Sequence, residues 1–599
     1  MAMHRSFVIG SWLVSLLPLF AVERPSDHAH PRLLFPVEME AQLREKIAAD
    51  PLAAELHENI LARANAVLRD RTCRYEKSDG KRLLPESRLA LHQIMHTAWA
   101  WRMTREKKYF DRALAEMEAA SAMNDWNPTH FLDTAEMSTA MAIGYDWLYR
   151  DLDQKQRDRY AQQIEQKGLR ALITRSSPWW TGATNNWSQV CGTGMSFAAI
   201  AIDERQPEIC ADILKQSRRL VEECLRFYQP DGAYPEGPDY WHYGSNYHIM
   251  HLAAMEVLFG QSAPPGLWRR SAEFMIHLNG PSGMPFNFAD GGLRSGFITP
   301  AQTWIASKFS DSSLPGWSRQ ALAASLPARK TSGSQIDHRF HPLHLLWLPA
   351  QKDQQDSIST HARFRGEQEM AFARTAWGDH AAWLAIKGGT GAASHGHLDA
   401  GSFVYEAGGV RWFVDLGKEN YNLPGYFGKQ RWDYFRLNNR SHNTWVIGDA
   451  LQVAAMPGCP VSDWTPEKLG STSCEIDLTP AYAKQCARAM RGVTFDKTNG
   501  AVSIKDLVEK PVGDLRWAVV TDASVRLDGK SVMLEKNGKR LILSREDDMG
   551  GEWREFSLLP PTPEQNKNEG FRMLGFVVAR GEELRIHVKW RLATEKSGR

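Results

Sequence analysis

The sequence predicts an α+β protein of more than one domain, in which a helical N-terminal part precedes antiparallel β-sheets. Three observations predict this fold class. Apolar residues recur at helical spacing from about residue 36 to about residue 327. A polar stretch follows at about 328–366, in which apolar residues recur neither at helical spacing nor at the alternating spacing of a strand. From about residue 381 onward, short β-branched and aromatic runs alternate with glycine-containing turns. A length of 599 residues agrees with several domains at roughly 100–200 residues each.

The helical part is defined by stripes of apolar residues. In the first stripe Leu91, Ile94, Met95, Ala98 and Trp101 follow the i, i+3, i+4, i+7 pattern. The same spacing occurs at 109–120 and 137–148, and further helices are expected at 188–202 and 248–259. Successive amphipathic helices with short turns pack as hairpins. Because no fixed-period repeat of the solenoid kind is present, we expect a helical toroid.

The C-terminal part is expected to form layered antiparallel sheets. Its first β-rich runs lie at 381–386, 402–405 and 410–414, and Gly408-Gly409 between the last two indicates a hairpin. Similar runs follow at 445–447, 501–504, 517–520 and 584–588.

The N-terminus is predicted to be a secretory signal. Arg5 precedes an apolar run from Phe7 to Ala21, which is short for a membrane span of about 20 residues. An uncleaved anchor is the alternative. Since no later stretch reaches spanning length, we expect a periplasmic or secreted protein without stable membrane insertion after cleavage. The expected division is 1–22 signal peptide, 23–345 helical toroid and 346–599 β-sheet domain.

Composition excludes several classes of protein. With 72 Lys+Arg against 70 Asp+Glu, the formal net charge is +2, which does not indicate a nucleic-acid-binding protein. The 43% hydrophobic content is ordinary for a globular chain and excludes disorder. The 22 Trp residues supply faces that suit sugar rings, although core packing accounts for many of them.

A histidine-rich motif is the first candidate for chemistry. His395 and His397 lie in Ser394-His-Gly-His-Leu-Asp399, and Asp415 and His442 follow. Two neutral imidazoles and a carboxylate suit Zn²⁺ or a similar divalent ion. In an extended segment the side chains of His395 and His397 point to opposite sides, so that one can serve the metal and the other the substrate. The alternative is a set of polar loop residues satisfied by the backbone.

Two further motifs lie in the helical part. Asn185-Asn186-Trp187 stands at the start of the helix expected at 188–202. One asparagine can cap this helix, and the second leaves an amide that can hydrogen-bond a substrate carboxylate. Residues 231–247 form a Gly/Pro-punctuated aromatic loop that contains Tyr240 and Tyr243. A tyrosine hydroxyl both donates and accepts a proton. An aromatic plug that closes the toroid is the alternative.

Taken in order, these motifs resemble the heparinase II/III-like polysaccharide lyases. They read Asn-Asn-Trp, Tyr-Pro-Glu-Gly-Pro-Asp-Tyr-Trp, Ser-His-Gly-His-Leu-Asp-Ala-Gly-Ser-Phe and Ser-His-Asn-Thr, and His30-Pro-Arg-Leu-Leu-Phe35 is similar to the opening of such chains. The resemblance implies an incomplete (α/α) toroid followed by antiparallel sheets, with the active site in the cleft between them. It also implies β-elimination of a uronate-containing polysaccharide to 4,5-unsaturated uronate products.

The resemblance also implies roles for individual residues. Asn186 would neutralise the uronate carboxylate, with Asn185 nearby, although some relatives have His where Asn186 stands. Tyr240 would give a proton to the leaving oxygen and can also act as the base, and His395 would be a base. Tyr243 is the rival to Tyr240.

The metal and substrate sites follow in the same way. By resemblance His397, Asp415 and His442 would hold a divalent metal, Zn²⁺ or Mn²⁺, with a structural role. Arginine forks suit carboxylate or sulfate, and a surface turn is the alternative for the arginines that precede His442. The predicted substrate-binding residues are Asn185, Gln189, Trp241, Tyr243, Arg436 and Arg440.

The expected partner is therefore an acidic polysaccharide, with glycosaminoglycans such as chondroitin sulfate, hyaluronan or heparan sulfate preferred and alginate as the alternative. A glycoside hydrolase on a helical toroid is a second possibility, since Glu236 and Asp239 supply two carboxylates. A non-catalytic polysaccharide-binding protein is a third. The sequence does not indicate an oligomeric state.

Overall fold

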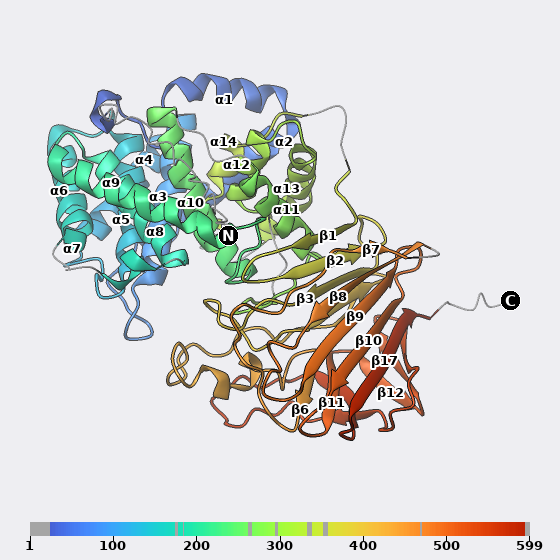
Figure 1. Ribbon diagram of the computed structural model, residues 1–599. Coiled ribbons are helices and arrows are strands. Elements are labelled where there is room, and N and C mark those ends of the chain that lie inside the picture. Colours follow the sequence, from blue (N-terminus) through green and yellow to red (C-terminus); the bar gives the residue numbers. More distant parts are fainter. Residues whose placement is uncertain are drawn as a thin grey trace, which may run out of the picture.

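The computed structural model describes residues 24–173, 178–183, 185–260, 266–293, 298–331, 338–351, 357–467 and 470–593. The predicted signal peptide lies outside them. Helices form one half of the molecule and β-sheets the other, as Figure 1 shows. The last helix, α14, spans Pro342–Leu346, and the first strand, β1, spans His361–Phe364. The predicted fold class, a helical toroid followed by antiparallel sheets, is confirmed.

The helical half is built from antiparallel hairpins with an inner and an outer helix. The inner helices are α3 (Leu84–Thr104), α5 (Phe131–Leu148), α8 (Asn186–Ala201) and α10 (Pro238–Phe259). Every residue of α5 is buried, which is typical of a helix that is packed on all sides. The outer helices α4 (Lys107–Ala122), α6 (Gln154–Gln163) and α9 (Pro207–Glu223) bury one side only.

The remaining helices cover the edges of this half. Among the described residues, no helix combines the length and the apolar composition that a membrane crossing requires. The helices at the edges are α1 (Glu38–Ala49), α2 (Pro51–Val67), α7 (Arg170–Ile173), α11 (Leu267–Leu278), α12 (Pro300–Lys308) and α13 (Leu314–Thr331).

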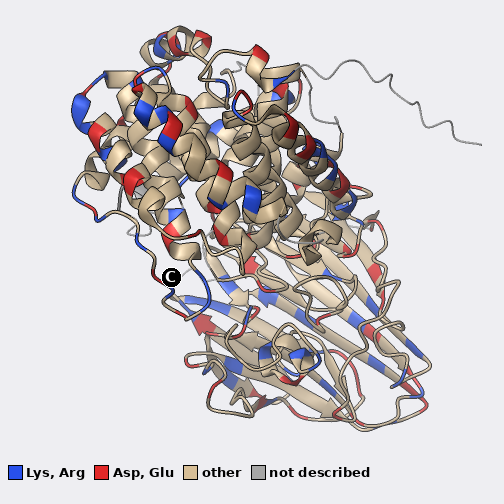
Figure 2. Cartoon of the chain, turned by 90° about the vertical axis from the view of Figure 1, so that its left-hand side faces the viewer, with Lys and Arg blue, Asp and Glu red and all other residues tan. Residues whose placement is uncertain are grey.

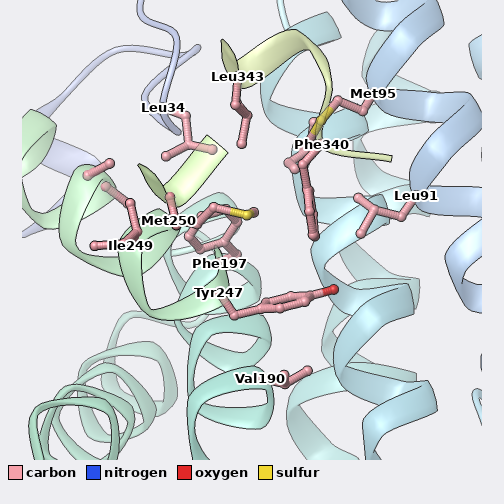
Figure 3. Close-up of a cluster of buried hydrophobic side chains, with 14 of the residues drawn as sticks. Leu34, Leu91, Met95, Val190, Phe197, Tyr247, Ile249, Met250, Phe340 and Leu343 are labelled. Carbon is pink, nitrogen blue, oxygen red and sulfur yellow. The ribbon is translucent and has the colours of Figure 1, made fainter. Parts of the chain in front are cut away.

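A continuous apolar core holds the inner helices together. Figure 3 shows part of it, with side chains from α3, α8, α10, α14 and the N-terminal segment meeting in one cluster. Each fully buried large side chain contributes about 1.5–3 kcal/mol. The packing fixes the N-terminal ends of α8 and α10, which carry candidate site residues. The labelled members are Leu34, Leu91, Met95, Val190, Phe197, Tyr247, Ile249, Met250, Phe340 and Leu343.

A five-stranded sheet separates the helices from the rest of the β half. It runs in sequence order through β1, β2 (Met370–Arg374), β3 (Trp383–Lys387), β4 (Phe403–Ala407) and β5 (Val410–Phe413). Alternate side chains of a strand point to opposite faces. Phe372 accordingly packs with the helical core, whereas its neighbours Ala371 and Ala373 pack with the other sheets. This sheet is therefore a middle layer buried on both faces.

The predicted hairpin between β4 and β5 is confirmed. Ala407 pairs with Val410, so that only Gly408 and Gly409 form the turn. Both glycines have positive φ, 64° and 77°, as a tight two-residue turn requires.

The other strands form two antiparallel sheets, in which β8, β9, β10 and β17 lie side by side in Figure 1. Strand β9 alternates buried and more exposed residues, which is the pattern of a sheet with one solvated face. Acidic and basic residues are interspersed over helices and strands in the view of Figure 2.

The strand orders in the two antiparallel sheets are β12-β13-β14-β17-β10-β9-β8-β7 and β15-β16-β11-β6. The bounds are β6 (Trp445–Ile447), β7 (Thr465–Pro466), β8 (Ser471–Asp477), β9 (Arg488–Asp496), β10 (Val502–Glu509), β11 (Leu515–Thr521), β12 (Ser524–Asp528), β13 (Ser531–Lys536), β14 (Lys539–Arg545), β15 (Arg554–Phe556), β16 (Arg572–Val578) and β17 (Glu583–Leu592).

One helix begins much earlier than the apolar pattern predicts. The sequence suggests a helix at 248–259 after a long aromatic loop, but α10 already begins at Pro238. Proline is favoured in the first helical turn, and Gly237 before it has a φ of 90° that suits glycine. Tyr240 and Tyr243 therefore lie on the first turns of a helix, one turn apart, rather than on a loop.

The opening motif His30–Phe35 anchors the N-terminal segment to α5. The fully buried Asp146 carboxylate accepts hydrogen bonds from the backbone N–H groups of Arg32 (2.9 Å) and Leu33 (2.8 Å). It also contacts His30 Nδ1 at 2.5 Å, and His30 Nε2 lies 3.2 Å from Glu204. Burial lowers the pKa of His30, but its bonds to these two carboxylates outweigh burial, and the net pKa lies above 6.5.

This anchor predicts a pH-dependent loss of stability. A raised folded-state pKa gives stabilisation that is present below pH 6.5 and is lost as the pH rises through the folded-state value. The Asp146→Asn substitution should therefore lower the melting temperature more at about pH 6 than at about pH 8.5. Differential scanning fluorimetry at both pH values measures this. The exposed Asp158, paired with Arg205, gives a matched control in Asp158→Asn, which should have little effect. An equal loss at both pH values would contradict the role assigned to His30.

Candidate functional site

The candidate site lies where the two halves meet, and one buried carboxylate joins its parts. Asp290 follows α11 in the helical half and is fully buried. Its Oδ2 lies 2.6 Å from His395 Nδ1, and its Oδ1 lies 3.0 Å from His397 Nε2. Oδ1 also accepts hydrogen bonds from Tyr426 Oη (2.7 Å) and Arg431 Nη2 (3.0 Å). Four side chains of the β half are therefore fixed to one residue of the helical half.

The charge on Asp290 determines the orientation of His395. Burial raises the pKa of Asp290, but the hydrogen bonds from His395 and His397 and the positive charge of Arg431 outweigh it and hold the pKa well below its ordinary value. An ionised carboxylate only accepts hydrogen bonds, so His395 Nδ1 carries a proton. In the neutral imidazole the lone pair then lies on Nε2, on the side of Glu236, 3.8 Å from Oε1.

The backbone at His395 is strained and clamped. His395 has a φ of 59°, which is uncommon for a residue other than glycine. A Cβ at Gly396 would meet Gly391 O at 2.6 Å, so only glycine fits there. Arg431 donates to the carbonyl oxygens of His395 (2.8 Å) and Gly396 (3.0 Å). The segment is thus a tight turn and not extended. The expectation that His395 and His397 point apart is wrong, because both face Asp290.

Asn186 is held by a second buried carboxylate, Glu236. Glu236 accepts hydrogen bonds from Asn186 backbone N (2.9 Å), Asn186 Nδ2 (3.1 Å) and Tyr234 Oη (2.6 Å). Asn186 Oδ1 is buried without a hydrogen-bond partner among the described residues. Asn185 caps α8, since its side chain accepts from the backbone N–H of Trp187 at 3.0 Å. The two neighbouring asparagines therefore have different structural roles.

Tyr240 lies directly against His395. The two rings stack with centroids 3.9 Å apart and an interplanar angle of 21°. The Tyr240 hydroxyl lies 2.9 Å from the hydroxyl of Tyr421, which follows β5. Burial raises the pKa of Tyr240 far above its ordinary value, and the charge of Asp290 raises it further. Tyr240 is therefore a neutral phenol at neutral pH and can donate a proton.

Tyr243 occupies a different environment from its rival. The Arg88 guanidinium lies over the Tyr243 ring at 4.7 Å, and Arg88 is paired with the buried Glu136 at 2.8 Å. Of the two tyrosines, Tyr240 is thus the one that contacts His395.

The three predicted metal ligands come together in one buried cluster. Asp415 Oδ2 lies 2.8 Å from His442 Nδ1, and the rings of His397 and His442 have centroids 5.3 Å apart. His397 Nδ1 and His442 Nε2 are buried and have no hydrogen-bond partner among the described residues, which is costly for polar atoms. Within the part of the chain that the structure describes, no group of three His, Cys, Asp or Glu side chains is arranged as a coordination shell. The donor types fit a divalent metal, and the two unpaired nitrogens are the atoms that would bind it, whereas Asp415 Oδ2 lies on the opposite nitrogen of His442 and orients that ring.

Two predicted substrate-binding residues lie beneath the site. Gln189 is fully buried, and its amide donates to Tyr228 Oη (2.7 Å) and accepts from Tyr234 Oη (3.2 Å). Trp241 is also fully buried, and its Nε1 donates to Ser271 Oγ at 2.8 Å. Neither offers surface to a sugar in this structure, and their contact with substrate stays a prediction.

The two predicted arginines are held within the β half. Arg436 Nε donates to Asn568 Oδ1 at 2.8 Å, and Arg440 Nη2 donates to Asp449 O at 2.7 Å. Their contact with substrate stays a prediction. The arginine of this segment that contacts the site is Arg431.

Tryptophans beside Asn186 form the exposed part of the site. Trp179 is 61% exposed and packs against Trp187 with ring centroids 4.8 Å apart. Trp180, in contrast, is buried. An exposed indole next to a preorganised amide is a suitable platform for a sugar ring.

Sequence reasoning missed Asp290 and Tyr421 and gave Glu236 a different role. Asp290 precedes Gly291-Gly292, which is an ordinary turn signal, and Tyr421 lies in a polar stretch without periodicity. Their proximity to His395 comes only from the docking of the two halves. For Glu236, the Tyr-Pro-Glu-Gly motif was a signal, but the sequence did not reveal its burial.

Comparison with known proteins agrees with this arrangement. Residues 363–594 match the family model described as "Heparinase II/III-like, C-terminal". No curated protein sequence matches the chain. Among solved structures, a crystal structure of heparinase III has a TM-score of 0.62 at 14% identity and covers 90% of this chain and 86% of its own.

Two further structures are similar at low identity. A mutant of heparan sulfate lyase HepC from Pedobacter heparinus has a TM-score of 0.58 at 12% identity, covering 96% of this chain and 94% of its own. Chondroitin AC lyase from Streptomyces coelicolor A3, in complex with chondroitin sulphate, has a TM-score of 0.53 at 12% identity, covering 94% and 83%. The chain thus has the fold of these lyases, and its residues 363–594 match the model of the heparinase II/III-like C-terminal family.

Proposed function

We propose that the protein is a polysaccharide lyase that cleaves a uronate-containing acidic polysaccharide by β-elimination. The observation that supports this most directly is the grouping of the Asn186 amide, the Tyr240 hydroxyl and His395 Nε2 around the junction of the two halves. In this proposal the substrate is a glycosaminoglycan such as chondroitin sulfate, hyaluronan or heparan sulfate, and alginate is the alternative. The protein acts in the periplasm or as a secreted enzyme after removal of residues 1–22.

The residues offer the groups that β-elimination requires. One N–H of Asn186 Nδ2 stays on Glu236, and the other donates to the uronate carboxylate, which acidifies the C5 proton. His395 Nε2 removes this proton, the C5–H electrons form the C4=C5 double bond, and the C4–O bond breaks. Tyr240 donates its proton to the departing oxygen. Each proton transfer by a positioned group is worth about 10²–10⁴-fold.

Asp290 and Glu236 act as positioning residues in this scheme. Asp290 holds the proton on Nδ1 and stabilises the imidazolium that forms when Nε2 takes up the C5 proton. Glu236 orients the Asn186 amide by accepting a hydrogen bond from its Nδ2. Trp179 supplies a stacking surface for a neighbouring sugar.

A divalent metal, Zn²⁺ or Mn²⁺, is proposed at His397, Asp415 and His442. It would brace the turn that carries His395, without taking part in proton transfer. The unpaired nitrogens of His397 and His442 support this proposal.

The glycoside hydrolase alternative is weakened by the state of Glu236. Both of its oxygens accept hydrogen bonds, and the residue is fully buried. A hydrolase needs two carboxylates that flank the scissile bond and reach it.

The first prediction concerns the reaction itself. The wild-type protein should produce ultraviolet-absorbing 4,5-unsaturated products from at least one member of a panel of chondroitin sulfate, hyaluronan, heparan sulfate, heparin and alginate. The Tyr240→Phe variant should lose at least about 10²-fold in kcat, because it lacks the proton donor. The matched control Tyr75→Phe changes an exposed tyrosine and should retain activity. New reducing ends without absorbance would show hydrolysis, and binding without new ends would show a non-catalytic protein.

The second prediction tests Asp290. Asp290→Asn should lower kcat about 10²–10⁴-fold while KM changes little, because the imidazole loses its orienting charge but the substrate surface remains. Steady-state kinetics on the best panel substrate measure the changes in kcat and KM separately. Asp433→Asn, at an exposed aspartate near Arg431, is the control. A rise in KM at unchanged kcat would assign Asp290 to substrate binding and not to positioning of His395.

The third prediction concerns the metal. Protein purified from medium supplemented with Zn²⁺ and Mn²⁺ should contain close to one equivalent of a divalent metal by mass spectrometry. His442→Ala should lose that metal and melt at a lower temperature, whereas the exposed His380→Ala should keep it. Metal-free wild-type protein after such growth would refute the site.

A further inference from the structure

A charged cavity lies at the far end of the helical half from the candidate active site. It has a volume of about 460 Å³ and is formed where α5 and α8 end, against the segment 26–32. Helix α8 has 16 residues and Asn186 at its first position, so the cavity lies about 24 Å from Asn186 along the helix axis. A cavity of this size is suitable for one or two sugar units.

The walls of the cavity carry more positive than negative charge. Arg32, Arg150 and Arg157 line it, whereas Glu204 is the only acidic residue among the described residues of the lining. Arg32 is buried and bonds Glu204 at 2.5 Å, so this pair is neutral. The charges of Arg150 and Arg157 remain uncompensated, because neither forms an ion pair within the described residues.

Both unpaired guanidinium groups are held in place by the backbone. Arg150 Nε donates to His30 O at 2.9 Å, and Arg157 Nε donates to Tyr149 O at 3.0 Å. The Arg157 guanidinium also lies over the Tyr149 ring at 4.4 Å. These contacts use Nε and leave the Nη groups available, so each fork is ordered before any ligand binds. An ordered fork loses little side-chain entropy when it binds an oxyanion in bidentate fashion.

The aromatic ring in the lining is covered on its faces by neighbouring side chains. His30 stacks on the Tyr149 ring with centroids 3.9 Å apart, and Arg157 covers the same ring. The aromatic surface is therefore occupied. Sulfate ester and carboxylate oxygens are the groups that match the two guanidinium forks.

We propose that this cavity is a second binding site for an acidic sugar residue, in which Arg150 and Arg157 hold a sulfate or carboxylate group away from the active site. The identification of the ligand as part of the polysaccharide rests on the proposed function, whereas the oxyanion chemistry does not. Such a site would retain a long chain on the enzyme between cleavage events.

The test counts binding sites in a protein that does not turn over substrate. Full-length Tyr240→Phe protein is titrated by calorimetry with a sulfated heparin tetrasaccharide, an unsulfated hyaluronan tetrasaccharide and neutral maltotetraose. We expect two sites for an acidic tetrasaccharide and none for maltotetraose. Adding Arg150→Ala and Arg157→Ala should weaken one of the two sites at least tenfold and leave the other unchanged. Lys155→Ala with Arg159→Ala removes equal charge from the same region and should leave both sites unchanged.

A second variant guards against misfolding of the double mutant. Ala29 lies exposed in the lining, so Ala29→Glu places a carboxylate in the cavity without disturbing the core and should abolish the same site.

Arg150→Lys with Arg157→Lys keeps the positive charge but loses the planar guanidinium groups, and should retain less than a tenth of the affinity. Preference for heparin over hyaluronan would identify sulfate as the bound group, and equal affinity would identify carboxylate.

The outcomes separate this proposal from the proposed catalytic function. If the protein is not a lyase and its cleft binds nothing, the cavity should still bind one acidic tetrasaccharide, and the double variant none. Unchanged stoichiometry and affinity in both the Arg150/Arg157 double variant and Ala29→Glu would overturn the second site, whatever the activity of the enzyme.

Discussion

The carboxylate of Asp290 is the interaction on which the candidate site depends. It comes from the helical half, is fully buried, and contacts His395, His397, Tyr426 and Arg431 of the β half. A buried carboxylate is stable only when its charge is compensated by nearby donors. The four partners supply that compensation, and in return the carboxylate fixes their positions. Docking of the two halves and assembly of the site are therefore one event.

The surrounding fold keeps this arrangement rigid. The five-stranded sheet is buried on both faces, and the turns after β3 and β5 carry His395 and Asp415 into the junction. The strained φ of His395 is tolerated because Arg431 holds the carbonyl oxygens of His395 and the adjacent Gly396. Strain that is held by specific contacts is a common property of functional sites. On the helical side, Glu236 fixes Asn186 in position by accepting hydrogen bonds from its backbone and its side-chain amide.

Much of the fold was predictable because its signals are local. Helical stripes and the Gly408-Gly409 turn depend on residues that are close in sequence, and both features occur as expected. The early start of α10 was missed because Gly and Pro are read as breakers, although proline at a helix start is favourable. The candidate trio Asn186, Tyr240 and His395 was found because its motifs are distinctive. The full burial of Gln189 and Trp241 was not foreseen, because periodicity does not reveal which side of a helix faces a cleft. Asp290 and Tyr421 carry no motif, and only tertiary packing brings them to His395.

The division of the site between the two halves also bears on when activity can arise during synthesis. A nascent chain that has emerged only as far as α14 holds Asn186 and Tyr240 but lacks His395, so it contains an acid and an amide without their imidazole partner. The eight-stranded sheet is completed late, since β10 pairs with β17 at the C-terminal end of the described chain. It packs on the five-stranded sheet from which the His395 turn extends, so the candidate site is supported from both sides only after the last strand has paired. A fragment that stops earlier can have a folded helical half and still lack this support.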